Sequence, residues 1–352
     1  MRALTVLPRT ARSLRLENVP EPTIDQGVVL VRGIALGVCG TDLEIIDGQH
    51  GEAAPGSERL ILGHESLGRV EEAPADSGLA RGDLVVGIVR RPDPVPCSSC
   101  AVGEWDMCRN GKYTEHGIKA LDGFGAEWYR LEPDFAIRVD PALGVLGVLV
   151  EPASIVAKAW EHTERIGHRV HWEPRTLLVT GAGPIGLLAA LLGAQHGLEV
   201  HVFDRNESGP KPELVRDLGG TYHTASLASL GIVPDVVMEC TGAPAVVFDV
   251  LDGTSRGGVV CLTGVSSSGQ RMPVDVGLVN RTLVLQNDAV FGSVNANRRH
   301  YEAAVAALVA ADRDWLARLI TRRVPLDRWE EAFADRPGDV KTVIELEPSG
   351  GR

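Results

Sequence analysis

Two patterns of hydrophobic and polar residues divide this chain. Up to about residue 145, short apolar runs such as Val28–Val31, Gly68–Glu71 and Leu84–Val89 alternate with glycine- and proline-rich turns, which is typical of a compact, mostly β domain. From about residue 150, apolar runs of strand length alternate with segments of helical length, which predicts a parallel sheet. The predicted strands of this sheet are Thr176–Thr180, Glu199–Phe203, Val236–Glu239, Val259–Thr263 and Leu283–Leu285.

After about residue 296 the pattern changes again. An amphipathic helix over Tyr301–Ala310 and a last strand, Thr342–Leu346, are expected to rejoin the first domain, and Pro348–Arg352 is expected to fray. The 352 residues are enough for two cores. We therefore predict one domain from residues 1–150 with 296–352, and a second from 151–295.

The strand Thr176–Thr180 leads into a G-x-G-x-x-G sequence, Gly181 to Gly186, followed by a helical segment and a second strand ending at Asp204. This is the context of a dinucleotide-binding turn. Gly181 allows the tight turn, Gly183 lets the backbone approach a pyrophosphate, and Gly186 lets the helix and the strand pack closely. Pro184, followed by Ile185, suits the first helical turn, where its missing N–H costs little.

A membrane span is the alternative interpretation of this region, because Leu177–Leu198 contains no formally charged residue. Glycines in its middle and its continuation into a strand favour a buried α/β core instead.

Composition narrows the class of protein. A net charge of −12 argues against a surface that binds nucleic acid. The N-terminus leads directly into strand-like sequence without the charged and apolar regions of a signal peptide. Six cysteines, three of them clustered, suggest metal ligands in a reducing compartment rather than a disulfide framework. We therefore expect a cytoplasmic protein that binds neither membranes nor nucleic acids.

Candidate ligands for a catalytic zinc ion lie in glycine-flanked turns of the β domain. Cys39, His64 and Glu65 offer a thiolate, an imidazole and a carboxylate, and Glu151 at the domain junction could be a fourth ligand. Each residue taken alone has an ordinary explanation: a small buried cysteine, a loop histidine with satisfied hydrogen bonds, or an acid at the start of a helix.

Taken together, the motifs carry a resemblance that covers nearly the whole chain. The order Gly-x-Cys-Gly-Thr-Asp, Gly-His-Glu, a cysteine-rich lobe and G-x-G-x-x-G resembles the zinc-dependent medium-chain alcohol dehydrogenase superfamily. Further segments resemble its glucose 1-dehydrogenase branch, best known from archaea. These segments are Arg90-Arg91, Asp106–Cys108, Tyr113–Ile118, Asp122–Phe124, Val150–Pro152, Gly292–Asn295 and Arg299–Tyr301.

The resemblance implies a GroES-like, mostly β catalytic domain and a Rossmann domain with a doubly wound parallel sheet. It also implies that the catalytic zinc is surrounded by Cys39, His64, Glu65 and Glu151. A second carboxylate would leave the zinc site net negative, so we predict that Glu151 binds zinc weakly or moves between the ion and a substrate hydroxyl. The residues that the resemblance places at the sugar site are Thr41, Glu115, Glu151, Asn295 and His300, with Thr41 also accepting the substrate proton.

The second metal site is incomplete. Cys97, Cys100 and Cys108 resemble the last three cysteines of the superfamily's structural zinc lobe, but Pro94 stands where the first cysteine should be. Structural zinc normally takes four protein ligands. Asp93 could supply an oxygen if the loop shifts; otherwise the lobe is metal-free.

The choice of cofactor depends on Asp204 and Arg205. An acid at the end of this strand bonds the free 2′-hydroxyl and repels a 2′-phosphate, so we predict NAD, with residual use of NADP through Arg205. Further cofactor contacts are expected at the carboxyl edge of the sheet, where ligands bind in open parallel sheets. The residues expected there are Thr241, Gly264, Ser293 and Asn295.

The leading hypothesis is a zinc-dependent NAD(P) dehydrogenase that oxidises an aldose such as glucose at its anomeric carbon to a lactone. On the same fold, the substrate could instead be a polyol, a cyclitol, an amino sugar or a secondary alcohol, since position 89 is Val and position 157 is Ala. A catalytically silent nucleotide-binding protein is a third possibility, although Cys39, His64 and Glu65 are all present. The resemblance implies a homodimer or homotetramer.

Overall fold

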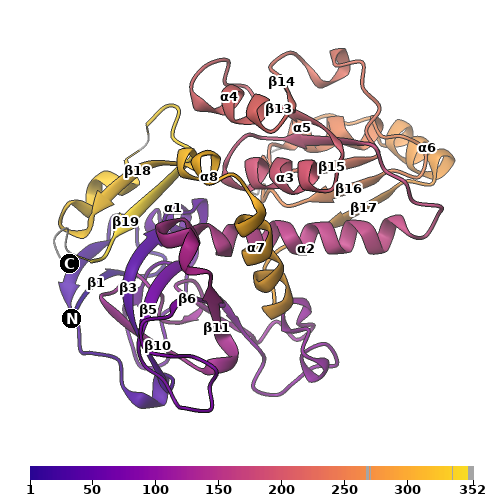
Figure 1. The fold of residues 1–352 in the computed structure, drawn as a ribbon. Helices are drawn as coiled ribbons and strands as arrows, with labels where there is room; N and C mark the ends of the chain where they lie inside the picture. Colours follow the sequence, from indigo (N-terminus) through magenta and orange to yellow (C-terminus); the bar gives the residue numbers. More distant parts are fainter. Residues whose placement is uncertain (267–268, 270, 335, 348–352) are drawn as a thin grey trace. The chain divides into compact units, whose positions relative to one another are not determined.

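The computed structural model describes residues 1–266, 269, 271–334 and 336–347, so the end predicted to fray, 348–352, lies outside the described residues. The chain forms two compact units (Figure 1). Unit 1 contains Met1–Ser154 and the C-terminal part from Asn295, and unit 2 contains Ile155–Val294. Helix α2, Val150–Gly167, begins in unit 1 and continues into unit 2.

Unit 1 is mostly β, and its main sheet has the order β11-β6-β5-β3-β19-β18, with β10 also paired to β3. Two small sheets, β2-β1-β4 and β7-β8-β9, accompany it. The strands are β1 Arg2–Val6, β2 Arg15–Asn18, β3 Val29–Gly37, β4 Leu60–Ile61, β5 Glu65–Glu72, β6 Leu84–Gly87, β7 Arg90–Arg91, β8 Thr114–His116, β9 Ala120–Leu121, β10 Trp128–Leu131, β11 Ala136–Val139, β18 Ile320–Pro325 and β19 Lys341–Glu345. The helices are α1 Gly40–Ile46, α7 Arg298–Ala310 and α8 Arg313–Leu319.

The C-terminal strand joins the N-terminal part of the chain, as predicted. In β19, Val343 pairs with Gly37 and Ile344 pairs with Leu36 of β3 in an antiparallel register. Alternate residues of β3 point to opposite faces of the sheet, and Val29 and Val31 are fully buried with Ile344 in one hydrophobic core. Unit 1 is therefore closed by residues from both ends of the chain.

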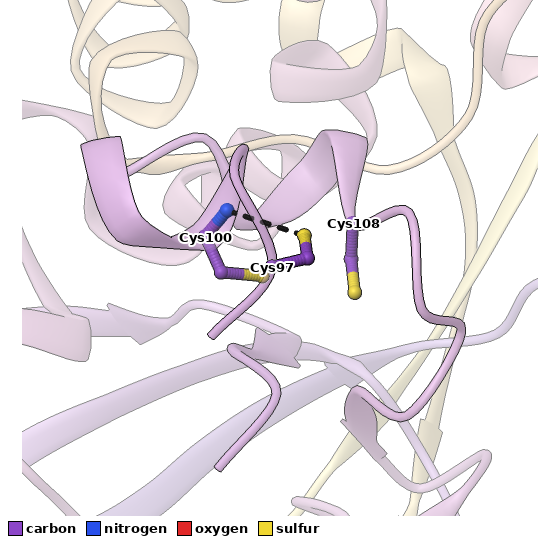
Figure 2. Close-up of side chains that lie close together, drawn as sticks. All are labelled: Cys97, Cys100 and Cys108. Atoms are coloured by element: carbon purple, nitrogen blue, oxygen red, sulfur yellow. Dashed lines mark hydrogen bonds between the residues drawn. The ribbon is translucent and has the colours of Figure 1, made fainter. Parts of the chain in front are cut away.

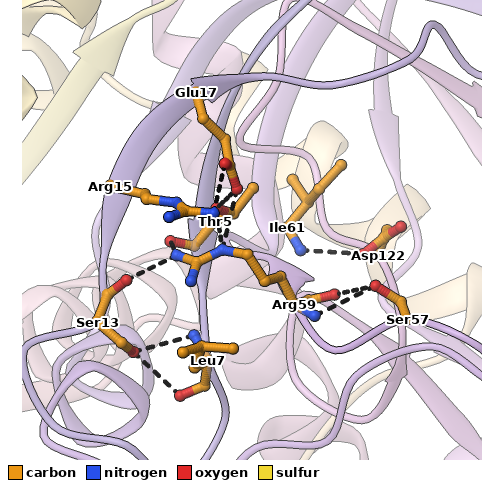
Figure 3. Close-up of polar contacts among 9 residues, drawn as sticks. All are labelled: Thr5, Leu7, Ser13, Arg15, Glu17, Ser57, Arg59, Ile61 and Asp122. Atoms are coloured by element: carbon orange, nitrogen blue, oxygen red, sulfur yellow. Dashed lines mark hydrogen bonds and ion pairs between the residues drawn. The ribbon is translucent and has the colours of Figure 1, made fainter.

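A polar cluster connects the first strands of unit 1 (Figure 3). Arg59 donates from Nε to Thr5 Oγ1 at 2.7 Å and from Nη2 to the Ser13 carbonyl at 2.7 Å, and it pairs with Glu17 at 2.9 Å. One side chain thus ties β1 and β2 to the segment between them, and the cluster lies in the wall of a hollow of about 900 Å³.

Unit 2 contains a six-stranded sheet in the order β14-β13-β12-β15-β16-β17, and every pair in it is parallel. The order reverses direction at β12, which makes this a doubly wound Rossmann-type sheet, as expected. Its strands are β12 Thr176–Thr180, β13 Glu199–Phe203, β14 Thr221–His223, β15 Val236–Glu239, β16 Val259–Leu262 and β17 Ala289–Gly292. Its helices are α3 Pro184–Gln195, α4 Pro210–Asp217, α5 Pro244–Asp249 and α6 Val276–Gln286.

One predicted strand is wrong. Leu283–Leu285 lies inside helix α6, and the edge strand is β17 instead. Asp275 caps the helix by accepting a hydrogen bond from the Leu278 amide at 2.9 Å, and Asn287 ends it in the left-handed conformation. A three-residue apolar run does not distinguish a strand from a helix, and here Leu285 is 57% exposed rather than part of a sheet core.

The apolar stretch Leu177–Leu198 forms strand β12, a turn and helix α3, so it is not one continuous span. Among the described residues, Pro141–Gly167 is the one helical stretch long and apolar enough to cross a membrane by length and composition. Its apolar window is 72% buried inside the structure, as in the core helix of a soluble protein, so this stretch is weak evidence for a membrane span.

Candidate active site

Three metal-binding side chains meet in unit 1. One ligand atom from each of Cys39, His64 and Glu65 lies within 4.8 Å of the other two. Cys39 ends the loop after β3 and immediately precedes helix α1, while His64 and Glu65 stand at the start of β5. Since β3 and β5 are paired antiparallel, with Gly37 opposite Glu65, the sheet itself brings the thiol beside the carboxylate.

Asp42 supports this cluster from the first turn of α1. Its Oδ2 accepts a hydrogen bond from the Cys39 amide at 2.9 Å, and its Oδ1 lies 3.3 Å from His64 Nδ1. Burial opposes a charge on His64, but the Asp42 carboxylate and Cys39 together outweigh it and raise the pKa of the imidazole well above its ordinary value. A carboxylate at Nδ1 leaves Nε2 as the nitrogen for a metal, and the donor set of sulfur, nitrogen and oxygen fits a zinc ion.

Glu65 has a partner that the sequence analysis did not identify. Lys341 Nζ lies 2.7 Å from both carboxylate oxygens of Glu65 and donates to the Val38 carbonyl at 3.0 Å. Both side chains of this ion pair are 2% exposed. Although burial disfavours the ammonium charge, the Glu65 carboxylate raises the pKa of Lys341 above its ordinary value. The carboxylate is therefore neutralised by an ammonium group from the C-terminal strand.

Glu151 is buried beside the cluster but is not part of its 4.8 Å set. Burial is the main cause that raises its pKa to about 8, with the His64 charge opposing the shift and Glu65 adding to it. A carboxyl that is costly to ionise next to a second carboxylate would be a weak ligand, and weak zinc binding by Glu151 stays a prediction.

Glu115, predicted at the sugar site, belongs to a buried polar network. Its Oε1 accepts hydrogen bonds from Arg90 Nε at 3.0 Å, Arg90 Nη2 at 2.9 Å and Asn295 Nδ2 at 2.8 Å. Arg90 also donates to the Asp106 carbonyl at 2.9 Å and lies 3.7 Å from the centre of the Tyr113 ring. In the described part of the chain no hydrogen bond is made to Glu115 Oε2, so that oxygen remains as an acceptor for a hydroxyl group.

Two other residues predicted at the sugar site occupy helix starts. Thr41 is half-buried in the first turn of α1. His300 is 1% exposed, and its Nδ1 accepts a hydrogen bond from the Asn297 amide at 3.1 Å, which caps α7. His300 therefore has a structural role at the start of α7, and its binding of the substrate stays a prediction.

The second cysteine cluster forms in a separate loop of unit 1. The sulfur atoms of Cys97, Cys100 and Cys108 all lie within 4.8 Å of one another (Figure 2). Amide groups of Arg109 and Cys100 donate to Cys97 Sγ at 3.3 Å and 3.5 Å and lower the pKa of this thiol to about 6.

Asp93, considered as a fourth ligand, is engaged elsewhere. Its Oδ1 accepts a hydrogen bond from the Val95 amide and its Oδ2 accepts one from Asn110 Nδ2, both at 2.8 Å. The carboxylate does not belong to the group formed by the three sulfur atoms. The structure therefore has a cluster of three ligands.

In unit 2 the glycine-rich turn has the geometry that a dinucleotide requires. Gly181 has φ of 90°, and a Cβ on Gly186 would lie 1.7 Å from the Gly181 carbonyl oxygen, so both positions need glycine for reasons within the protein. A Cβ on Gly183 would meet no protein atom within 4 Å. The open space at Gly183 is where a pyrophosphate would approach the backbone, at the N-terminus of α3 formed by Pro184 and Ile185.

Asp204 follows β13 and is mostly occupied inside the protein. Its Oδ2 accepts from the Ala182 amide at 2.7 Å and its Oδ1 accepts from the Asn206 amide at 2.8 Å, while Lys211 Nζ lies 3.4 Å away. The carboxylate thus fixes the glycine-rich turn, and its contact with a cofactor ribose stays a prediction. Arg205 is exposed beside it.

Further residues predicted to contact the cofactor lie at the carboxyl edge of the same sheet. Buried Glu239 accepts hydrogen bonds from the amides of Thr241 at 2.7 Å and Gly242 at 3.2 Å and so shapes the turn after β15. Gly264 follows β16, and a Cβ there would lie 2.1 Å from the Gly242 nitrogen. Ser293 follows β17, while Asn295 belongs to unit 1 and contacts Glu115.

Sequence reasoning missed three residues of the unit 1 sites: Asp42, Arg90 and Lys341. Asp42 had a local signal, because it stands three positions after Cys39 in the spacing of a helix capping box. Arg90 was noted only as part of a resemblance, and Lys341, which directly precedes the last predicted strand, was not noted at all. A charged residue opening an otherwise apolar strand was the one available signal for Lys341.

A mostly β unit that carries a cysteine, histidine and glutamate cluster, combined with a unit that carries a dinucleotide turn on a parallel sheet, defines the class of zinc-dependent medium-chain dehydrogenases. Two family models match the chain: "Alcohol dehydrogenase GroES-like domain" over residues 25–141 and "Glucose dehydrogenase C-terminus" over residues 144–346. The chain belongs to the glucose dehydrogenase family.

Individual relatives agree with this assignment over their full length. The chain is 41% identical to a glucose 1-dehydrogenase of Methanocella arvoryzae, covering 98% of this chain and 99% of the relative. It is 41% identical to glucose 1-dehydrogenase 1 of Caldivirga maquilingensis, covering 99% of each. The structure of Haloferax mediterranei glucose dehydrogenase in complex with NADP, Zn and gluconolactone matches with a TM-score of 0.91 at 32% identity, covering 99% of this chain and 100% of that one.

Proposed function

We propose that this protein is a zinc-dependent dehydrogenase that oxidises an aldose such as glucose at its anomeric carbon and passes the hydride to a nicotinamide dinucleotide. The observation that carries the proposal is the cluster of Cys39, His64 and Glu65, whose ligand atoms lie within 4.8 Å of one another. Relatives named glucose 1-dehydrogenase, at 41% identity over nearly the whole chain, support an aldose as the substrate.

Different residues of unit 1 would bind the zinc ion and the sugar. Cys39, His64 and Glu65 would hold the zinc ion, with Glu151 as a weak additional ligand. When bound, zinc supplies Lewis acidity that makes a coordinated hydroxyl group a stronger acid. Glu115 Oε2 is the free acceptor that would orient a sugar hydroxyl group, because Oε1 is fully used by Arg90 and Asn295.

The reaction removes a proton and a hydride from the same carbinol group. The anomeric hydroxyl group loses its proton to Thr41 Oγ1, and the threonine hydroxyl passes its own proton outward. The C1–H bond then breaks, and the hydrogen leaves with both bonding electrons as a hydride. The ring carbon becomes the carbonyl carbon of a lactone. The glycine-rich turn positions the cofactor that accepts the hydride.

For the cofactor we propose a preference for NAD with residual use of NADP. The negative charge of Asp204 opposes a 2′-phosphate, while exposed Arg205 and nearby Lys211 would attract one. The structure of the Haloferax relative holds NADP, which is why residual use of NADP is part of the proposal. A higher kcat/KM with NADP than with NAD would overturn the preference.

We further propose a cytoplasmic homodimer or homotetramer that acts on a small sugar and binds neither nucleic acid nor membranes. Acidic composition supports the absence of nucleic-acid binding, since a net charge of −12 repels polyanions. Sedimentation analysis of the purified protein tests the oligomeric state.

The test of the activity is a spectrophotometric screen for reduced nicotinamide. NAD and NADP are each offered with glucose, galactose, xylose, inositol and simple secondary alcohols, and every positive is repeated after chelation and after zinc is restored. Turnover of an aldose that disappears with zinc and returns with it is the expected result. Turnover of cyclitols or simple alcohols alone would keep the chemistry but reject the aldose, and silence with zinc bound would reject the proposed substrates.

A further inference from the structure

A buried carboxylate lies at the ligand-binding edge of the sheet in unit 2. Glu239 is the last residue of β15, and it is 0% exposed. Its Oε1 accepts hydrogen bonds from the Thr241 amide at 2.7 Å, the Gly242 amide at 3.2 Å and Thr180 Oγ1 at 3.3 Å. The Thr241 hydroxyl also donates to Oε1, and the Gly242 amide also reaches Oε2 at 3.2 Å. Since backbone amides can only donate, this arrangement stabilises the side chain as a negatively charged acceptor.

The charge of Glu239 has no counter-ion in the part of the chain that the structure describes. Its hydrogen-bond partners there are two backbone amides and two threonine hydroxyl groups, and no lysine, arginine or histidine forms an ion pair with it. Asp204 in the same unit differs, because Lys211 Nζ lies 3.4 Å from its carboxylate. A buried charge without a counter-ion is unfavourable, so a ligand that brings positive charge to this edge would be attracted to it.

The strand order assigns Glu239 to one half of a dinucleotide site. A dinucleotide lies across the point where the strand order reverses, with one mononucleotide over each half of the sheet. The half made of β12, β13 and β14 carries the glycine-rich turn and Asp204, which are features of the adenosine side. This leaves β15, β16 and β17 for the nicotinamide side. A Cβ at Gly264, after β16, would lie 2.8 Å from Glu239 Oε2, so glycine there lets the backbone approach this oxygen closely.

We propose that Glu239 is an electrostatic partner of the oxidised nicotinamide ring. The oxidised ring carries one positive charge and the reduced ring carries none, so a fixed negative charge on this side of the sheet favours the oxidised cofactor. It thereby lowers the reduction potential of the bound cofactor. Glu239 acts through its field and through the turn that it holds, which makes it a positioning residue. The inference rests on the nicotinamide dinucleotide of the proposed function, but it does not depend on the sugar.

The first experiment measures the Kd of NAD⁺ and of NADH without any sugar, NADH by its fluorescence and NAD⁺ by competition with it. In Glu239→Gln the Oε1 acceptor remains and the charge is lost. The Kd of NAD⁺ should therefore rise, while the Kd of NADH should change little. The expected rise in the ratio of the two constants is about threefold or more, as for a unit charge acting on another over roughly 10 Å with partial screening by solvent.

Thr180→Val is the matched control for Glu239→Gln. Thr180 is also 0% exposed, and the change removes one uncharged hydrogen bond to the same Glu239 oxygen. The melting temperature may fall in this control, but the ratio of the two constants should stay at the wild-type value. An unchanged ratio in Glu239→Gln, with both cofactors bound, would overturn the electrostatic role and leave the proposed function standing. Failure of the wild type to bind either cofactor would overturn the proposed function and this inference with it.

A second variant changes the local charge and keeps Glu239. Leu262 lies opposite Glu239 in the parallel register of β15 and β16 and is half-buried. A lysine at this position can bury its aliphatic stem and bring an ammonium group to the carboxylate. The ratio of the two constants should therefore rise in Leu262→Lys, as in Glu239→Gln. If Glu239→Gln does not fold, a wild-type ratio in Leu262→Lys would overturn the proposal.

Discussion

Arg90 offers the sharpest test of how the proposed sugar site is built. Its guanidinium group makes two hydrogen bonds to Glu115 Oε1, at 3.0 Å and 2.9 Å, and a third to the Asp106 carbonyl at 2.9 Å. Lysine at this position keeps the charge but not the planar fork, so it cannot hold Glu115 Oε1 and the Asp106 carbonyl in the same geometry. Glu115 would then turn, and its free oxygen would no longer be held towards the substrate.

The magnitude follows from the number and kind of contacts. A hydrogen bond to a charged group contributes about 1.5–3 kcal/mol, and each 1.4 kcal/mol corresponds to roughly tenfold in affinity. If misplacing Glu115 removes one such bond to the sugar, KM for the sugar should rise about ten- to a hundredfold in Arg90→Lys. In the proposed role Glu115 would bind a hydroxyl group in the ground state and the transition state alike, so kcat should change much less.

The assay compares the kinetic constants for sugar and cofactor with the melting temperature. Arg59→Lys is the matched control, because Arg59 also pairs with a glutamate, Glu17, at 2.9 Å but has no bond to Glu115. Arg59→Lys should lower stability and leave the sugar KM unchanged. The reasoning is refuted if Arg90→Lys behaves in the same way, losing stability with no change in the sugar KM.

Three further predictions concern charge and pH. In Lys341→Met the buried Glu65 loses its counter-ion, so the free energy of unfolding of the zinc-free protein, measured in urea, should fall by about 3–5 kcal/mol. Zinc should restore part of this loss because its charge replaces that of the ammonium group. An equal loss with and without zinc would contradict the prediction. Arg205→Glu should lower the kcat/KM ratio of NADP to NAD by about tenfold, corresponding to 1.4 kcal/mol of lost phosphate attraction, with little change for NAD alone; an unchanged ratio would remove Arg205 from the cofactor site. His116 is buried, and burial together with the Arg91 charge lowers its pKa well below 6.5, so only the unfolded chain gains this proton when the pH falls below about 6.5. The free energy of unfolding should therefore fall by about 2 kcal/mol between pH 6.5 and 5. In His116→Asn this contribution to the pH dependence should be absent, and urea unfolding at several pH values would measure the difference.

The parts of the fold that depend on local sequence were predictable. The glycine-rich turn and its flanking strands follow from short, continuous apolar runs such as Thr176–Thr180 and from glycines that only this turn explains, such as Gly181 with φ of 90°. The cluster of Cys39, His64 and Glu65 was predictable as a set of residue types, because Gly-x-Cys and Gly-His-Glu each stand in a recognisable motif. Leu283–Leu285 failed because a short apolar run can belong to an exposed helix as easily as to a strand.

The contacts between distant segments were not predictable. Lys341 and Glu65 are 276 positions apart, and only the pairing of β19 with β3, and of β3 with β5, brings the ammonium group to the carboxylate. No periodicity within either strand encodes that a charge on one must be matched by a charge on the other. Such buried pairs therefore become visible only after the register of the sheet is known.

Asn295 shows how the same limit affects the interpretation of a site residue. The sequence favoured Asn295 as a direct ligand of sugar and cofactor. In the structure the φ of Asn295 is 63°, a left-handed conformation that asparagine tolerates better than most residues. Its Oδ1 accepts a hydrogen bond from the Ala296 amide at 2.8 Å, and its Nδ2 donates one to Glu115 at 2.8 Å. The side chain therefore already has a reason to be asparagine that involves no ligand, namely holding the same Glu115 oxygen that Arg90 holds. A residue of a motif can thus affect substrate binding by positioning its neighbour. The KM for the sugar should therefore rise in Asn295→Ala, as it should in Arg90→Lys.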